Sequence, residues 1–244
     1  MDGEAVRRIE ELAVRANHIE KDGLTFVTGN YKVLGVVHES TVRFTTLLSF
    51  CGFINRNPQK LDLVGAIIVV NPDFSVALLS APNPLDGERT VYAIAKRQDT
   101  EGFLFGRPYD TESFTIALKS RFVREDSDWE EVFNIVKKIQ IDDKVEIEDD
   151  GISMKINLKQ GVSSASIATV KKKTDHELRP YRIFPECEQP KSVFFLRLSG
   201  DRESGATVSL HETDGGKWKI DAAEIISTFV ANGLSESVDI PIYC

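Results

Sequence analysis

The sequence predicts an α+β fold built mostly from antiparallel sheet, with about four helices. Apolar residues alternate with a period of two in many short segments, and only a few segments show the three-and-four spacing of a helix. Most strand-like segments are separated by turns of a few residues, which can join antiparallel strands but not parallel ones. Hairpin-linked strands with separate helices favour α+β over an alternating α/β arrangement.

The N-terminal part is predicted to form a helix and then a hairpin. Residues 4–17 carry apolar side chains at helical spacing among glutamates and arginines. Residues 24–28 and 31–37 are strand-like and are separated by Gly29-Asn30, which is a two-residue turn signal. These two strands are therefore expected to pair with each other.

A strand, a helix and a three-stranded meander are expected next. Residues 41–44 are strand-like, and Thr45 or Thr46 can cap a helix over residues 47–55 that ends before Pro58. The strands of the meander are residues 66–70, 76–80 and 90–96, joined by turns at residues 71–73 and 84–87.

Two helices and a second group of strands follow. Asp110 or Thr111 can cap a helix that reaches Phe122, and a helix over residues 127–139 has acidic residues in its first turn and lysines in its last. The later strands are expected at residues 145–147, 152–158, 162–170, 178–184, 193–198 and 206–211, before a helix at 220–231 and a short strand at 238–243.

The length of the chain is compatible with one large domain or two small ones. A polar stretch near residues 141–144 divides an N-terminal α+β lobe, residues 1–141, from a β-rich C-terminal lobe, residues 142–244, which holds the final helix. One continuous domain is the alternative that the sequence leaves open.

Charge and composition restrict the class of protein. The 244 residues carry a formal net charge of −8, which disfavours non-specific coating of duplex DNA. No apolar run reaches the length of a membrane span, and the charged N-terminus lacks the apolar region of a signal peptide. Cys51, Cys187 and Cys244 have no metal-ligand spacing and fit a reducing compartment. The sequence thus predicts a cytosolic protein without membrane contact.

The first of three candidate binding segments surrounds Gly106. Arg107 offers a planar fork for phosphate or carboxylate, and Tyr109 can stack on a base. The alternative is a tight turn in which the aromatic residues join the core and Arg107 pairs with Asp110 or Glu112.

The second segment, residues 178–190, places Arg179 and Arg182 on either side of Tyr181 and contains three prolines that favour extended backbone. Arginines with an aromatic residue between them suit a nucleotide-like anion and its base. The alternative is an edge strand, bounded by prolines, with surface ion pairs.

The third segment, residues 213–219, precedes the last predicted helix. Gly215 and Gly216 can expose backbone amides at a helix N-terminus, with Lys217 nearby, as in anion sites. The spacing is that of neither a P-loop nor a dinucleotide fingerprint, and a simple strand-to-helix turn is the alternative.

The sequence contains no known catalytic or metal-binding motif. His18, His38, His176 and His211 lack metal-ligand spacing, and there is no nucleophile elbow. No cofactor and no metal are expected. An enzyme whose site assembles from distant residues is left open.

Three stretches carry a resemblance to a known group, at residues 99–114, 178–190 and 210–218. From about Leu24 onward the chain resembles a family of proteins from phages and prophages of Gram-positive bacteria, and its layout is similar to the YfdQ-like prophage family. These motifs mark the group and bring no catalytic residue with them. The resemblance implies a viral protein that acts in the host cytosol outside the virion.

Together these features predict a non-enzymatic phage protein that binds a small anionic, nucleotide-like ligand, such as a host immune signal that it sequesters. The alternatives are an accessory protein of phage DNA replication or recombination, and a scaffold that acts through protein–protein contacts. A homo-oligomer with a pocket between subunits is also left open. The candidate ligand-binding residues are Arg107, Tyr109, Arg179, Tyr181, Arg182, Gly215, Gly216 and Lys217.

Overall fold

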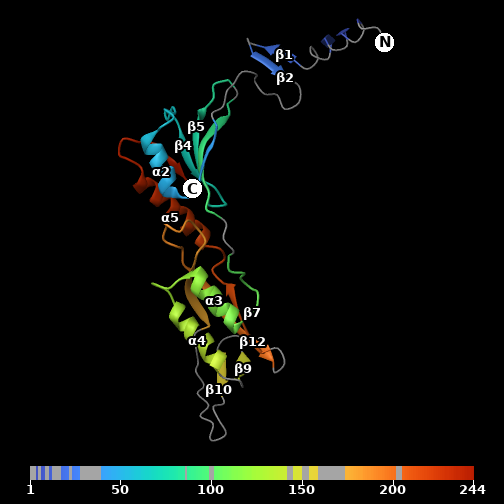
Figure 1. Cartoon of the computed structure of the whole chain (residues 1–244), viewed down its shortest axis with the longest axis vertical. Helices are drawn as coiled ribbons and strands as arrows, with labels where there is room; N and C mark the ends of the chain where they lie inside the picture. The colour runs from blue at the N-terminus through green and yellow to red at the C-terminus, as the bar shows by residue number, and fades with distance from the viewer. Residues whose placement is uncertain are drawn as a thin grey trace. The chain divides into compact units, whose positions relative to one another are not determined.

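The chain forms two compact units in a computed structural model (Figure 1). The structure describes Glu4, Arg7, Arg8, Glu11, Leu12 and residues 18–21, 24–27, 40–85, 87–98, 102–141, 145–149, 154–158, 174–201 and 205–244. The first unit comprises Met1–Phe44, Leu48–Lys96 and Leu234–Tyr243, and the second comprises Thr45–Leu47, Arg97–Gly233 and Cys244.

A five-stranded sheet forms the first unit, with the strand order β14-β4-β5-β6-β3. The three central strands pair antiparallel, which confirms the predicted meander, while the two edge strands run parallel to their neighbours. The strands are β3 (Val42–Phe44), β4 (Ile67–Val70), β5 (Val76–Pro82), β6 (Arg89–Ala95) and β14 (Ile242–Tyr243).

Helix α2 (Leu47–Arg56) has one apolar face that is buried. Phe50, Cys51 and Ile54 recur at helical spacing and are each at most 3 % exposed, so Cys51 is a core residue. The helix ends before Asn57, whose φ of 39° lies in the left-handed region that asparagine tolerates.

The N-terminal residues contain a hairpin that the sequence analysis did not predict. Strand β1 (His18–Lys21) pairs antiparallel with β2 (Leu24–Val27), so the observed partner of β2 precedes it in the chain. The sequence between them, Asp22-Gly23, is itself a two-residue turn signal. The expected partner, residues 31–37, and the turn Gly29-Asn30 lie outside the described residues.

The helix predicted over residues 4–17 falls partly outside the described residues. Those of its residues that the structure describes are helical: Glu4, Arg7, Arg8, Glu11 and Leu12.

The second unit contains another five-stranded sheet, fully antiparallel, in the order β7-β13-β12-β11-β8. Its strands are β7 (Tyr109–Asp110), β8 (Phe122–Val123), β11 (Asp175–Pro180), β12 (Ser192–Asp201) and β13 (Gly205–Glu212). The prediction of a strand over residues 178–184 was wrong at its end. Strand β11 stops at Pro180, which has no amide hydrogen for a ladder, and the following residues form a loop.

Helices α3 (Thr111–Arg121) and α4 (Trp129–Ile141) pack with the second sheet around a shared core. Asp110 caps α3, because its side chain accepts a hydrogen bond from the backbone amide of Ser113, as predicted. The largest fully buried side chains of this core are Phe114, Leu118, Phe122, Trp129, Ile135 and Phe194. Helix α5 (Trp218–Gly233) buries Ala222, Ile226 and Val230.

Strands β9 (Val145–Asp149) and β10 (Met154–Leu158) form the predicted antiparallel hairpin, while the strand expected at residues 162–170 lies outside the described residues. The expected lobe boundary near residues 141–144 falls inside the second unit. The two units follow contacts distant in sequence, such as the pairing of β14 with β4, which a composition change along the chain does not reveal. The elements confirm the α+β class.

Candidate functional site

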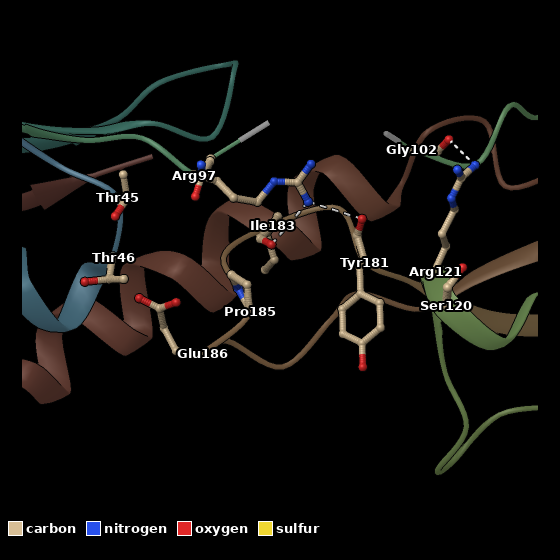
Figure 2. Close-up of a pocket in the computed structure, with 11 residues that line it drawn as sticks. Thr45, Thr46, Arg97, Gly102, Ser120, Arg121, Tyr181, Ile183, Pro185 and Glu186 are labelled. Atoms are coloured by element: carbon tan, nitrogen blue, oxygen red, sulfur yellow. Dashed lines mark hydrogen bonds between the residues drawn. The ribbon is translucent and has the colours of Figure 1, made fainter. Parts of the chain in front are cut away.

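The second unit contains a pocket of about 780 Å³, within the range of roughly 300–1,000 Å³ typical of small-molecule sites. All of its lining residues belong to this unit (Figure 2). They are Thr45, Thr46, Arg97, Gln98, Gly102, Ser120, Arg121, Tyr181, Ile183, Pro185 and Glu186. The set combines two arginines, hydroxyl groups, one aromatic ring and a carboxylate.

One loop, residues 181–189, supplies four of the lining residues, and Gln189 holds it from inside. The Gln189 side chain is 3 % exposed. Its Oε1 accepts hydrogen bonds from the backbone amides of Arg182 and Ile183, at 2.8 and 3.1 Å. Its Nε2 donates to the carbonyls of Phe184 and Cys187, at 3.0 and 3.1 Å. The loop is therefore fixed by a single buried amide.

A tight turn ends the pocket side of this loop. The backbone amide of Cys187 donates to the carbonyl of Phe184 at 3.0 Å, so Pro185 and Glu186 occupy the two central positions. Proline favours the first of these positions because its ring fixes φ near the required value. The turn leaves Pro185 exposed and Glu186 partly buried in the wall of the pocket.

Arg97 follows strand β6 and extends its guanidinium along the loop (Figure 2). Its Nη1 donates to the carbonyls of Tyr181, at 3.2 Å, and Ile183, at 3.4 Å. The side chain is partly buried, and among the described residues no carboxylate forms an ion pair with it. The other guanidinium nitrogens thus remain available to an anion.

Arg121 and Tyr181 lie in another part of the pocket. Arg121, the last residue of α3, donates from Nη1 to the carbonyl of Gly102 at 2.8 Å. Its own carbonyl accepts the backbone amide of Tyr181 at 2.9 Å, which ties the start of the loop to the end of the helix. The Tyr181 side chain is 43 % exposed, so a ring of a ligand can stack on it.

Glu186 contributes a carboxylate at the side of Thr45 and Thr46 (Figure 2). Its Oε1 accepts a hydrogen bond from the backbone amide of Leu47 at 2.6 Å. The sequence suggested Thr45 or Thr46 as the cap of this helix, and the structure adds a distant carboxylate at the first amide of the helix.

Of the eight predicted contact residues, Tyr181 alone is among the residues that line the pocket. Arg182, next to it, points into a different environment and is 8 % exposed. Its guanidinium pairs with Glu212 and donates to Ser192 Oγ at 3.1 Å. Burial lowers the pKa of the Arg182 guanidinium, and the Glu212 carboxylate opposes that shift. The rings around it are Trp218, Phe105 and Phe194, with centroids at 4.1, 4.8 and 5.5 Å.

The three segments predicted to form one site do meet, but around this side chain of the protein itself. Phe105 belongs to the first segment, Arg182 to the second and Trp218 to the third. The space that a ligand was expected to occupy is filled by the Arg182 guanidinium, which stacking and an ion pair hold in place. We call Arg182, Glu212 and these three rings the Arg182 cluster.

Arg179 is also held by the protein. Its side chain is 9 % exposed and pairs with Glu188 at 3.0 Å, while Nε donates to the carbonyl of Gln189 at 3.2 Å and Nη1 to that of Glu125 at 3.4 Å. These bonds fasten strand β11 to the ends of neighbouring loops. Arg179 is therefore positioned as a structural residue.

The first segment forms a packed turn. The Tyr109 hydroxyl accepts the backbone amide of Leu104 at 2.9 Å, and its ring stacks on Phe103 with centroids 4.9 Å apart. Gly106 has a φ of 75°, in the left-handed region that glycine adopts without strain, and its backbone amide donates to the carbonyl of Leu210. Arg107 is exposed and forms no ion pair with Asp110 or Glu112 among the described residues.

The third segment forms the turn into α5. Gly215 and Gly216 have φ values of 66° and 84°, and the amide of Gly216 donates to Asp214 Oδ1 at 3.0 Å. A carboxylate thus lies at this helix start, where an external anion was expected. Lys217 is exposed. The turn serves to deliver Trp218 to the Arg182 cluster.

The sequence analysis missed Arg97, Arg121 and Glu186 as pocket residues. Arg97 follows a strand and precedes a polar stretch, and Arg121 ends a helix, so each is an unremarkable surface arginine in its local pattern. The one available signal was Pro185-Glu186, whose turn position could have suggested an outward-facing carboxylate.

The comparisons with known proteins found no match among family models, curated proteins or solved structures. In the part of the chain that the structure describes, no cluster of three or more histidine, cysteine, aspartate or glutamate side chains could hold a metal ion. Over the same residues, no helix combines the length and apolarity needed to cross a membrane.

Proposed function

We propose that this protein binds a small anionic, nucleotide-like ligand in the pocket beside residues 181–186. Arg97 holds the anionic group, Arg121 adds positive charge, and a ring of the ligand stacks on Tyr181. The hydroxyl group of Thr45 can donate a further hydrogen bond, whereas that of Ser120 donates to the carbonyl of Ile116 and can only accept one. The chain acts as a binding protein, and its ligand leaves the site unchanged.

The observation that carries this proposal is the environment of Arg97. Its guanidinium is partly buried and oriented by two backbone carbonyls, which fixes its position without neutralising its charge. Surface arginines usually remain solvated, and enclosed ones usually pair with a carboxylate, as Arg179 and Arg182 do. A fixed, unneutralised guanidinium in a pocket favours an anion as ligand.

Tyr181 and its neighbours favour a flat, partly apolar ligand over a bare inorganic anion. The Tyr181 ring, Pro185 and Ile183 form an apolar wall next to Arg97. Small-molecule sites typically join such an apolar wall to a few fixed polar groups. A base attached to a phosphate matches this combination.

The test is a titration of the purified protein with AMP, GMP, inorganic phosphate and a short single-stranded DNA, followed by thermal unfolding and calorimetry. Arg97→Gln removes the charge and should weaken nucleotide binding at least tenfold, which corresponds to about 1.4 kcal/mol. A ligand at a hundred times its dissociation constant should stabilise the native protein by about 2.7 kcal/mol. Recovery of intact nucleotide afterwards supports binding without turnover.

The matched control is Arg197→Gln, because Arg197 is exposed on β12 and does not line the pocket. Equal affinity in the Arg97→Gln variant and the native protein would contradict the proposal. A response to single-stranded DNA alone would favour a replication accessory, and no response to any nucleotide would favour a scaffold. The phage relationship, the cytosolic location and sequestration of an immune signal remain expectations from the sequence.

A further inference from the structure

One peptide unit in the loop of residues 181–189 connects Gln189 to Arg97. Its N–H belongs to Arg182 and donates to Gln189 Oε1 at 2.8 Å. Its C=O belongs to Tyr181 and accepts from Arg97 Nη1 at 3.2 Å. A trans peptide unit is planar, so its N–H and C=O point in opposite directions. The hydrogen bond to Gln189 therefore fixes the direction in which the Tyr181 carbonyl meets the arginine.

Gln189 also restrains the second carbonyl that Arg97 binds, which is that of Ile183. The Ile183 amide donates to Oε1 at 3.1 Å, and the next carbonyl, that of Phe184, accepts from Nε2 at 3.0 Å. The Gln189 side chain is buried and is not among the residues that line the pocket. It thus holds the backbone on both sides of the Ile183 carbonyl without reaching a ligand.

The two carbonyls occupy one nitrogen of Arg97 and leave the other two. Each Nη of a guanidinium carries two hydrogens, and Arg97 Nη1 donates to the carbonyls of Tyr181 and Ile183 (Figure 2). Nε and Nη2 have no hydrogen-bond partner among the described residues. On a planar guanidinium these two nitrogens present parallel N–H groups, which is the arrangement that binds two oxygens of one phosphate.

We propose that Gln189 is the positioning residue of the pocket: through the peptide unit of residues 181–182 it orients Arg97 so that Nε and Nη2 bind the phosphate of the ligand together. This role rests on the proposed function and adds to it a residue that does not touch the ligand. Without the Gln189 oxygen the peptide unit can rotate, and the guanidinium loses its fixed direction. The amide of Tyr181 stays bonded to the carbonyl of Arg121 at 2.9 Å, so the ring that stacks on the ligand keeps its support.

The experiment measures the affinities of AMP and adenosine by calorimetry, because adenosine keeps the ring that stacks on Tyr181 and lacks the phosphate. Gln189→Leu should weaken AMP binding about tenfold, as expected for the loss of one charge-assisted hydrogen bond, and change adenosine binding by less than about twofold. In the Arg97→Gln background the same substitution should cause no further loss of AMP affinity, because the two residues act through one contact.

The control for general destabilisation is Ile135→Ala, which truncates a buried side chain of α4 that does not line the pocket. It should change neither affinity. If Gln189→Leu does not fold, Gln189→Asn replaces it, since its amide is one methylene too short to keep the bonds of Gln189, and the same outcomes decide.

An equal loss of AMP and adenosine affinity in Gln189→Leu would overturn the positioning role, as would a similar loss in Ile135→Ala or a further loss in the Arg97→Gln background. Weaker AMP binding in Arg97→Gln together with native AMP binding in Gln189→Leu would overturn the positioning role and keep the proposed function. Equal AMP affinity of Arg97→Gln and the native protein would overturn both.

Discussion

Arg182 belongs to the loop of residues 181–189 and Arg97 binds two carbonyls of that loop, yet the environments of the two side chains differ. Arg182 is enclosed by Trp218, Phe105 and Phe194 and neutralised by Glu212. Arg97 is held by the carbonyls of the loop and borders a pocket. Arg182 stabilises the packing inside the second unit. Arg97 keeps a positive charge that no carboxylate among the described residues neutralises.

This difference shows how a conspicuous sequence motif can be structural. Arginines interleaved with aromatic residues suit a bound nucleotide, but the same chemistry stabilises an arginine inside the protein. The guanidinium of Arg182 occupies the space between the rings of Phe105, Phe194 and Trp218. These rings therefore stack on a side chain of the protein and not on a ligand. The pocket forms on the other face of the loop, where the backbone carbonyls of Tyr181 and Ile183 orient Arg97.

The largest expected effect comes from the residue that supports both faces of the loop. Gln189→Leu removes four hydrogen bonds from buried or partly buried backbone groups. Each unsatisfied buried group costs roughly 1–3 kcal/mol, so the free energy of unfolding should fall by about 4 kcal/mol after partial relaxation. Urea unfolding monitored by tryptophan fluorescence measures this change.

The control for that variant is Gln59→Leu, because Gln59 is exposed and outside the loop. Its unfolding free energy should change by less than about 0.5 kcal/mol. A loss of similar size in both variants would mean that Gln189 is not the internal support of the loop.

The next effect separates the two arginines directly. Arg182→Ala removes the ion pair and the ring contacts of a side chain that is 8 % exposed, and should lower the free energy of unfolding by about 3 kcal/mol. Arg97→Ala should lower it by less than about 1 kcal/mol, since its lost partners are two carbonyls accessible from a pocket. Chemical denaturation of the two variants in parallel provides the comparison, and equal losses would break it.

The fold was largely predictable because its signals are local. The meander of β4, β5 and β6 follows from alternating apolar residues and proline-containing turns, and the start of α3 follows from Asp110. The division into units was not predictable from local patterns. Residues 234–243 return to the first sheet through β14, and only long-range packing determines that pairing.

The pocket was predictable only in part, for a similar reason. Tyr181 could be chosen because an aromatic residue between prolines and arginines is unusual in sequence. Arg97 and Arg121 come from the ends of a strand and a helix that are far apart in the chain, so their approach to Tyr181 depends on tertiary structure. Sequence chemistry identified the loop, and the fold determines which of its faces is open.

A smaller effect tests whether loss of stability alone can mimic loss of the site. Asp110→Ala removes the N-cap of α3, which is in the same unit but does not line the pocket. The unfolding free energy should fall by about 1 kcal/mol, the usual contribution of an N-cap. Nucleotide affinity, measured by calorimetry below the unfolding temperature, should equal that of the native protein, in contrast to Arg97→Gln. Weaker binding would show that the pocket responds to general destabilisation.

The smallest effect is the pH dependence of the stability that the Asp110 cap contributes, since a carboxylate titrates in the acid range and a guanidinium does not. Hydrogen bonds from the side chain and backbone of Ser113 lower the pKa of Asp110 below its usual value near 3.8. The folded-state pKa is therefore below the unfolded one, so this contribution to stability is complete above about pH 5 and is lost as the pH falls through the folded pKa. A guanidinium group stays protonated over that range. In unfolding measurements from pH 6 to pH 3, Asp110→Asn should lose less stability on acidification than the native protein, because its cap does not titrate. Parallel pH profiles for the two proteins would show that Ser113 does not favour the ionised form of this carboxyl group.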